Sequence, residues 1–201
     1  MGSVFAHISV SVDGYVADAA GGLGWWSADD EFDRYIDGML ESISGMVFGR
    51  VAFDALAQFW PTAGPEVSLI QRHRMHELPK YVLSHAPLDT TWHNSHRLAG
   101  DPRWAIESVA RDAAGDIAVF AGAGAIRAAL SSGVLDELRL VVHPVLVGSG
   151  LPLFDGTHPA QSLRVRETTS FGSGAHVVRY SLPAPAERLP AATPATVGSP
   201  W

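Results

Sequence analysis

The chain has 201 residues, and its 47% hydrophobic against 17% charged residues indicate one folded domain rather than a disordered chain. The net charge of −7 argues against nucleic-acid binding, which usually requires a basic surface. The absence of cysteine excludes disulfides, thiolate catalysis and cysteine-ligated zinc. With no apolar run near the ~20 residues that span a bilayer and no secretory signal pattern, we expect a cytoplasmic protein without nucleic-acid or membrane partners.

The first half of the chain alternates predicted strands and helices. An apolar strand over 4–12 ends at an Asp-Gly turn pair, and a glycine-rich loop over 17–26 follows. Ser27 is the expected N-cap of a helix with one apolar face, which we expect to end near Gly45. The next predicted elements are a strand over 46–48, a helix over 49–58, a helix over 65–77, a strand over 80–83 and a short strand over 90–94.

The second half continues this alternation and finishes in strands. Pro144 interrupts one strand and predicts an edge position or a bulge there. Residues 184–201 are rich in Pro and Ala without periodicity, so we expect a poorly ordered tail after a domain of residues 1–183. The predicted elements are a helix over 102–113, a strand over 117–121, a helix over 123–130 ended by Gly133, a strand over 138–146, and a hairpin of strands over 163–169 and 175–182.

This order predicts an α/β domain with a mostly parallel central sheet flanked by helices and an antiparallel C-terminal hairpin at one edge. Ligands of such sheets bind at the carboxyl ends of the strands. The stretch FAGAGAIRAAL over 120–130 lies at one such end. Its small residues indicate either a tight turn that packs a helix closely on the sheet or a helix start that binds phosphate.

Four short motifs occur along the chain in a characteristic order. They are DGY at 13–15, GR at 49–50, DEL at 136–138 and PVLVGSGLPLF at 144–154. With these motifs the chain resembles, over residues 4–182, the dihydrofolate reductase superfamily, most closely the branch that contains the reductase domain of the bifunctional riboflavin-biosynthesis enzyme. The resemblance implies a dihydrofolate reductase-like fold, NADPH as cofactor with NADH as the other option, a small-molecule substrate and a homodimer.

The resemblance also implies which residues hold the cofactor along the carboxyl edge of the sheet. The family usually has Gly-Gly, often joined by a cis peptide, where this chain has Ala121-Gly122, and a cis bond there would cost ~3 kcal/mol. We expect Gly122→Val to abolish cofactor binding while leaving the fold. The implied residues are Ser9 at the nicotinamide; Val16 in the loop over 16–26 that covers it; Gly49, Arg50, Val51 and Ala52 at the phosphates; Ser84 and His85 at the 2′-phosphate; and Ala121, Gly122, Ala123, Gly124, Ala125 and Ile126 around the pyrophosphate.

Hydride delivery needs a proton source, and a buried carboxyl group is one candidate. Asp13 is either such a group or only a turn residue. The family's substrate-binding acid corresponds to Asp33 when residues are counted back from Gly49, and to Glu31 or a neighbour when they are counted from Trp26. Acidic residues at a helix start are equally explained by the helix dipole. We leave the proton donor unassigned and do not expect folate reduction.

Two further sets of residues have two interpretations each. Trp25 and Trp26 either stack on a substrate ring or hold the loop over the core. His73 and His76 lie three apart in a predicted helix among arginines, which favours a solvated face, so we assign no metal.

The sequence therefore predicts an NADPH-dependent reductase that transfers a hydride to a small heterocyclic, carbonyl or imine substrate. The alternatives are a non-catalytic nucleotide-binding protein of the same fold, a structural relative whose site has decayed, and a stand-alone riboflavin-pathway pyrimidine reductase. The zinc deaminase domain of the bifunctional enzyme is not expected, because its cysteine ligands and the room for it are absent.

Overall fold

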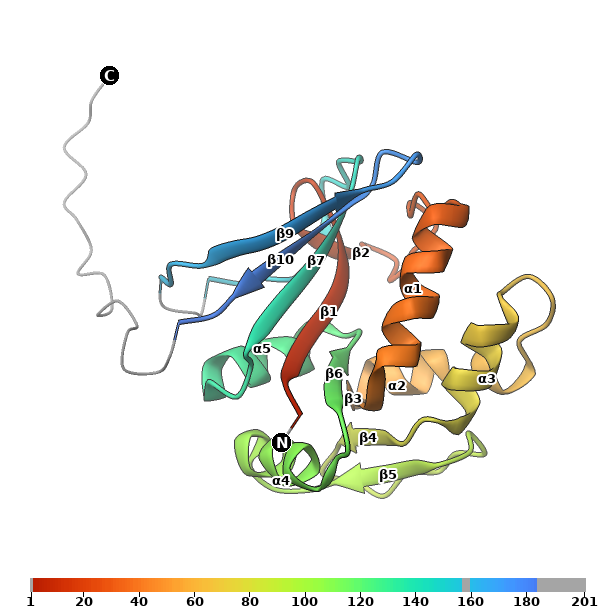
Figure 1. Cartoon of the computed structure of the whole chain (residues 1–201), viewed down its shortest axis with the longest axis vertical. Coiled ribbons are helices and arrows are strands. Elements are labelled where there is room, and N and C mark those ends of the chain that lie inside the picture. The colour runs from red at the N-terminus through yellow and green to blue at the C-terminus, as the bar shows by residue number, and fades with distance from the viewer. Residues whose placement is uncertain (1, 157–159, 184–201) are drawn as a thin grey trace.

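The computed structural model describes residues 2–156 and 160–183 as a central sheet with helices on both sides (Figure 1). The tail expected over 184–201 lies outside these residues. The strands of the domain are β1 (Val4–Ser11), β2 (Tyr15–Asp18), β3 (Ile43–Gly49), β4 (Lys80–Leu83), β5 (Ser95–Leu98), β6 (Asp116–Phe120), β7 (Glu137–His143), β8 (Gly150–Pro152), β9 (Arg164–Ser170) and β10 (His176–Ser181). Its helices are α1 (Asp30–Ser42), α2 (Arg50–Leu56), α3 (Leu69–Glu77), α4 (Pro102–Asp112) and α5 (Ala123–Ser132), with a 3₁₀ turn η1 (Trp60–Thr62).

Within the described residues, eight strands form the main sheet in the order β5-β4-β3-β6-β1-β7-β10-β9. The first six strands run parallel, while β10 pairs antiparallel with both β7 and β9. The predicted fold class is therefore confirmed, including the hairpin at one edge. No helix in the described part of the chain has the length and apolar character that a membrane span requires.

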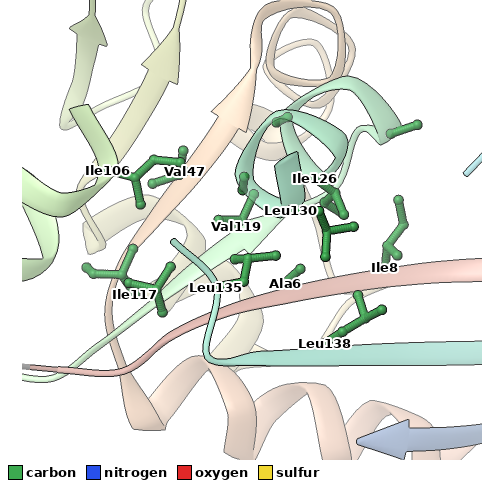
Figure 2. Close-up of a cluster of buried hydrophobic side chains, with 14 of the residues drawn as sticks. Ala6, Ile8, Val47, Ile106, Ile117, Val119, Ile126, Leu130, Leu135 and Leu138 are labelled. Carbon is green, nitrogen blue, oxygen red and sulfur yellow. The ribbon is translucent and has the colours of Figure 1, made fainter. Parts of the chain in front are cut away.

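Strand β1 shows why the sheet needs helices on both faces. Alternate side chains of a strand point to opposite faces, and Ala6 and Ile8 of β1 are buried in a cluster with Ile126 and Leu130 of α5 (Figure 2). Phe5 points to the other face, where it joins a second cluster with residues of α1 and α3. The sheet is thus covered by α4 and α5 on one side and by α1 and α3 on the other.

The start and end predicted for α1 are both wrong. Its N-cap is Asp29, whose side chain accepts a hydrogen bond from the Phe32 amide at 2.8 Å. Ser27 lies in the preceding segment, where its amide donates to Nδ1 of His143. The helix ends at Ser42, and Gly45 lies inside β3. A Cβ at Gly45 would lie 3.2 Å from both the Ile117 and Tyr81 side chains, so close packing explains this glycine.

Other boundaries differ for local reasons. The strand predicted over 90–94 is absent, because the buried Trp92 anchors this segment by donating from Nε1 to the Met75 carbonyl at 3.0 Å, and β5 begins at Ser95. β7 ends before Pro144 and lies between β1 and β10, so this proline marks neither an edge nor a bulge. α3 begins only at Leu69, and α2 ends at Leu56. The short pair β2 and β8 was not predicted, since neither strand carries an alternating pattern.

Candidate active site

Two strand-to-helix junctions lie side by side at the carboxyl edge of the sheet. Strands β3 and β6 are parallel neighbours, so α2 and α5 begin next to each other. A Cβ at Gly122 would lie 2.8 Å from Cβ of Ala52, and one at Gly49 would lie 3.3 Å from Cβ of Ala125. Close packing of the two helix starts therefore explains both glycines. It also corrects the expectation for Gly122→Val: with φ at +87° and this contact, the variant would damage the fold as well as any binding.

The first turn of α5 is open where Gly124 lies. A Cβ there would meet nothing within 4 Å, and the residue is exposed. The N-cap Gly122 has no side chain to satisfy the first amides, and the Ile126 amide makes the first intrahelical bond, to the Gly122 carbonyl at 3.3 Å. The amides of the first turn are thus available to a ligand, and such amides bind anions.

The turn that leads into α5 is itself unusual. Ala121 has φ +56°, a left-handed conformation that costs a non-glycine residue roughly 1 kcal/mol or more and that clusters at functional sites. None of the described peptide bonds is cis, including that between Ala121 and Gly122. The expected turn is present in trans geometry.

Two arginines flank the end of β4. The Arg50 guanidinium donates to both carboxylate oxygens of Asp54 at 2.7 and 2.9 Å and to Ser84 Oγ at 3.4 Å. It thus makes a surface ion pair and also reaches the residue implied for the 2′-phosphate. Arg97, near the end of β5, donates to the His85 carbonyl at 3.1 Å. Sequence reasoning missed Arg97 because it placed a strand over 90–94 and so did not identify this strand end.

A line of buried polar side chains lies on the α1 face of β1 and β7. Within the described residues, this face holds four of the six buried polar side chains: His7, Ser9, Ser11 and His143. Ser9 and Ser11 are paired in register with Val141 and His143, so these side chains share one face. Burying a polar group costs free energy unless the group makes a hydrogen bond, to the protein or to a ligand. The alternation of His, Ser and Ser with apolar residues in the first strand was the available sequence signal.

Both histidines of this line, and Tyr35 on α1, have a polar atom without a hydrogen-bond partner in the described structure. Within the described part of the chain, Nε2 of His7, Nε2 of His143 and the Tyr35 hydroxyl are buried without a hydrogen bond. The His7 ring stacks on that of Tyr35 from α1, with centroids 5.8 Å apart. His143 lies further along the same face, because it pairs in register with Ser11 rather than with His7. Unpartnered buried groups along one face of a sheet are candidates for binding a ligand.

The proton positions of this cluster follow from its contacts. The Ser27 amide donates to Nδ1 of His143 at 3.0 Å, so the neutral ring carries its proton on Nε2. Burial lowers the pKa of His143, and burial together with the Arg139 charge lowers the pKa of His7 to about 3. Burial also raises the pKa of Tyr35 to about 12. All three groups are therefore neutral at pH 7, with Nε2 of His143 and the Tyr35 hydroxyl as hydrogen-bond donors.

The two tryptophans of the glycine-rich loop lie against His143. The Trp26 ring stacks on the imidazole with centroids 5.6 Å apart and an angle of 13°, and Trp25 approaches it edge-on at 5.7 Å. Phe32 of α1 contacts the same ring at 6.0 Å. The loop over 16–26 thus covers the carboxyl ends of β1 and β7, and its aromatic rings enclose the unpartnered donor.

Of the three candidate carboxylates, Asp13 contacts the buried polar line only through the Ser11 hydroxyl, and Glu31 and Asp33 lie elsewhere. Asp13 accepts hydrogen bonds from the Ser11 hydroxyl at 2.6 Å and from the amides of Val147 and Gly148, and the first of these contributes most to lowering the pKa of Asp13 to about 2. The ionised Asp13 carboxylate therefore links the turn after β1 to the loop around Val147 and Gly148. Glu31 accepts from the Gly172 amide at 2.9 Å and so holds the β9–β10 turn.

Asp33 is exposed on the outer side of α1. There it lines a shallow groove together with Arg34 and Glu66. Its carboxylate is thus directed away from the sheet. The buried neutral groups lie on the face of the candidate site, and Asp13 is the one candidate carboxylate that contacts this face, at Ser11.

Comparisons with known proteins agree with this architecture. The RibD C-terminal domain family model matches residues 3–177. The uncharacterized protein YyaP of Bacillus subtilis is 25% identical over 178 residues, which cover 88% of this chain and 93% of the relative.

Two solved structures share the fold. A putative riboflavin biosynthesis protein from Shewanella has a TM-score of 0.69 at 21% identity, covering 90% of this chain and 99% of the other. A pyrimidine reductase-like protein from Corynebacterium diphtheriae has a TM-score of 0.66 at 15% identity, covering 90% and 92%. Since the family model spans the chain from before β1 into β10, this protein belongs to the RibD C-terminal domain family.

Proposed function

We propose that the protein is an NADPH-dependent reductase of a small planar heterocycle, of the pyrimidine type, or of a related carbonyl or imine compound. Membership of the RibD C-terminal domain family implies a reductase in general terms. The observation that carries the finer proposal is that the open start of α5 and the buried polar line of β1 and β7 occur at the same edge of one sheet.

The residues at the start of α5 fit a dinucleotide pyrophosphate. Gly124 leaves room for a phosphate, and the first-turn amides of α5 supply donors with partial positive charge. Gly49 and Ala52, which pack against this turn, hold it in place. NADPH, when bound, supplies the hydride.

The end of β4 fits the additional phosphate that distinguishes NADPH from NADH. Arg50 and Arg97 flank Ser84 and His85, and guanidinium groups are well suited to phosphate. The contact between Arg50 and Asp54 is half-exposed, so a phosphate competes with a weak surface pair. We therefore expect a preference for NADPH.

The buried polar line fits a planar substrate with hydrogen-bond acceptors. Nε2 of His143 and the Tyr35 hydroxyl donate to carbonyl oxygens or ring nitrogens of the substrate, and because both groups are neutral they orient and polarise it without a charge. Trp26 stacks on one side of this region and closes it to water. Ser9, between the buried His7 and Ser11 on β1, lies beside the reacting ring.

A non-catalytic nucleotide-binding protein is the second candidate. It would need only the α5 start and the two arginines, and it would leave the unpartnered groups of the polar line unexplained. Those groups favour a reductase.

The test has two stages. NADPH and NADH are titrated against the intrinsic tryptophan fluorescence, and saturable quenching with tighter binding of NADPH is expected. NADPH oxidation is then followed with a panel of aminopyrimidines, pterins, imines and carbonyl compounds. Turnover of a planar heterocycle supports the reductase, binding without turnover of any compound supports the second candidate, and no quenching with either nucleotide contradicts both.

A further inference from the structure

A cluster of three metal-binding side chains lies away from the candidate active site, at the opposite edge of the sheet. His76 and Glu77 are the last residues of α3, and His93 lies in the segment before β5. One ligand atom of each lies within 4.8 Å of the others, the one such group of three found in the described part of the chain. Because these residues precede β4 and β5 and the cofactor edge follows them, the two places are separated by the length of the strands (Figure 1).

The geometry points to a binding site for a divalent late transition metal, Zn²⁺ or a similar ion, at His76, Glu77 and His93. Two imidazoles and one carboxylate are a donor set that suits Zn²⁺, Co²⁺, Ni²⁺ and Cu²⁺, whereas Mg²⁺ and Ca²⁺ prefer oxygen ligands alone. Three protein ligands leave one tetrahedral position for water.

The distances allow this coordination after small movements. Nε2 of His76 lies 3.9 Å from a carboxylate oxygen of Glu77, and the His76 and His93 rings stack with centroids 4.7 Å apart. Metal–ligand bonds of about 2.0–2.2 Å need ligand atoms roughly 3.3 Å apart. All three side chains are exposed, so they are free to rotate toward one ion.

The backbone below the cluster is fixed by side-chain hydrogen bonds: Lys80 of β4 holds the end of α3, and Asn94 links that end to the segment of His93. Nζ of Lys80 donates to three carbonyls at the end of α3, those of Met75, His76 and Leu78, at 2.6 to 2.9 Å. Nδ2 of Asn94 donates to the Glu77 carbonyl at 2.7 Å. A metal therefore does not have to order the chain in order to bind, which favours affinity.

This pairing differs from the one considered from the sequence. His73 and His76 lie one turn apart on α3, but the structure brings His76 to His93, which is 17 positions further along the chain. The alternative is a pair of stacked, solvated imidazoles with no ligand. Metal binding distinguishes the two, because it requires all three side chains to converge on one ion.

The experiment uses the full chain without an affinity tag. Zn²⁺ is titrated by calorimetry and Co²⁺ by visible absorption, which reports tetrahedral coordination. We expect one ion per chain, weaker binding at lower pH because protons compete for the imidazoles, and a loss of at least about tenfold in affinity in both His76→Ala and His93→Ala.

The matched control is His73→Ala, an exposed histidine on the same helix, which should bind as the wild type does. Circular dichroism confirms that each variant folds. Absence of saturable binding, unchanged binding in His93→Ala, or an equal loss in His73→Ala would each overturn the proposal.

Discussion

The two faces of β1 differ in a way that separates stability from function. On the α5 face, Ala6 and Ile8 are packed among aliphatic side chains and carry no polar atom to satisfy. On the α1 face, His7, Ser9 and Ser11 are just as deeply buried. The comparison teaches that burial alone does not identify a core, because the α1 face combines an apolar cluster around Phe5 with polar side chains that are kept out of water.

The largest effect should come from the apolar face. Ile106 of α4 is fully buried against this side of the sheet. Ile106→Ala should lower the free energy of unfolding by about 2–5 kcal/mol, because it removes buried methyl groups and leaves a cavity. Urea denaturation measures this loss, and affinity for NADPH should stay within about twofold among the folded molecules. A stability loss below about 1 kcal/mol would show that this face is not the main core.

The polar face of β1 should make the stability of the protein depend on pH, through the buried His7. Burial and the Arg139 charge lower the pKa of His7 to about 3 in the folded protein, against an ordinary value of about 6.5 when unfolded. The unfolded chain then binds the extra proton between these values, so this group lowers stability as the pH falls from about 6.5 towards 3, by up to about 1.4 kcal/mol per pH unit.

Urea denaturation between pH 6.5 and 4.5 measures that slope. His7→Phe should reduce it, and His73→Ala, which changes an exposed histidine, should not. An unchanged slope in His7→Phe would mean that His7 is not held neutral by burial.

The smallest effect on stability is expected at Tyr35. Its hydroxyl is buried without a partner in the described structure, so Tyr35→Phe should leave stability unchanged or raise it by up to about 1 kcal/mol. Turnover of the substrate should fall, because a donor to the bound ring is lost. A stability loss above about 1 kcal/mol in urea denaturation would show that the hydroxyl serves the fold instead.

How far the sequence predicts this molecule depends on how local the signal is. β4 and the end of α5 at Gly133, which has φ +75°, follow from apolar runs and a glycine stop, and both predictions are confirmed. Gly45 was misinterpreted as a helix end because its reason, contact with Ile117 and Tyr81, lies on other strands.

The candidate site likewise contains residues with a local sequence signal and residues without one. The glycine-rich stretches and the family resemblance locate the turn at Gly122 and the loop with Trp25 and Trp26, but His143 and Arg97 were missed. His143 becomes notable only when strand register sets it beside Ser11 and the loop amide of Ser27 reaches its ring. Such pairings between distant segments leave no pattern in a single sequence.

The central claim is that the open start of α5 receives the dinucleotide, and Gly124→Glu tests it most directly. The new side chain fits, since a Cβ there meets nothing within 4 Å, but its charge opposes a phosphate. In the fluorescence titration, this variant should bind NADPH at least about 100-fold more weakly than wild type, while Gly38→Glu, at an equally open helical glycine on α1, should bind normally. A Gly124→Glu protein that folds and binds NADPH as the wild type does would contradict the account.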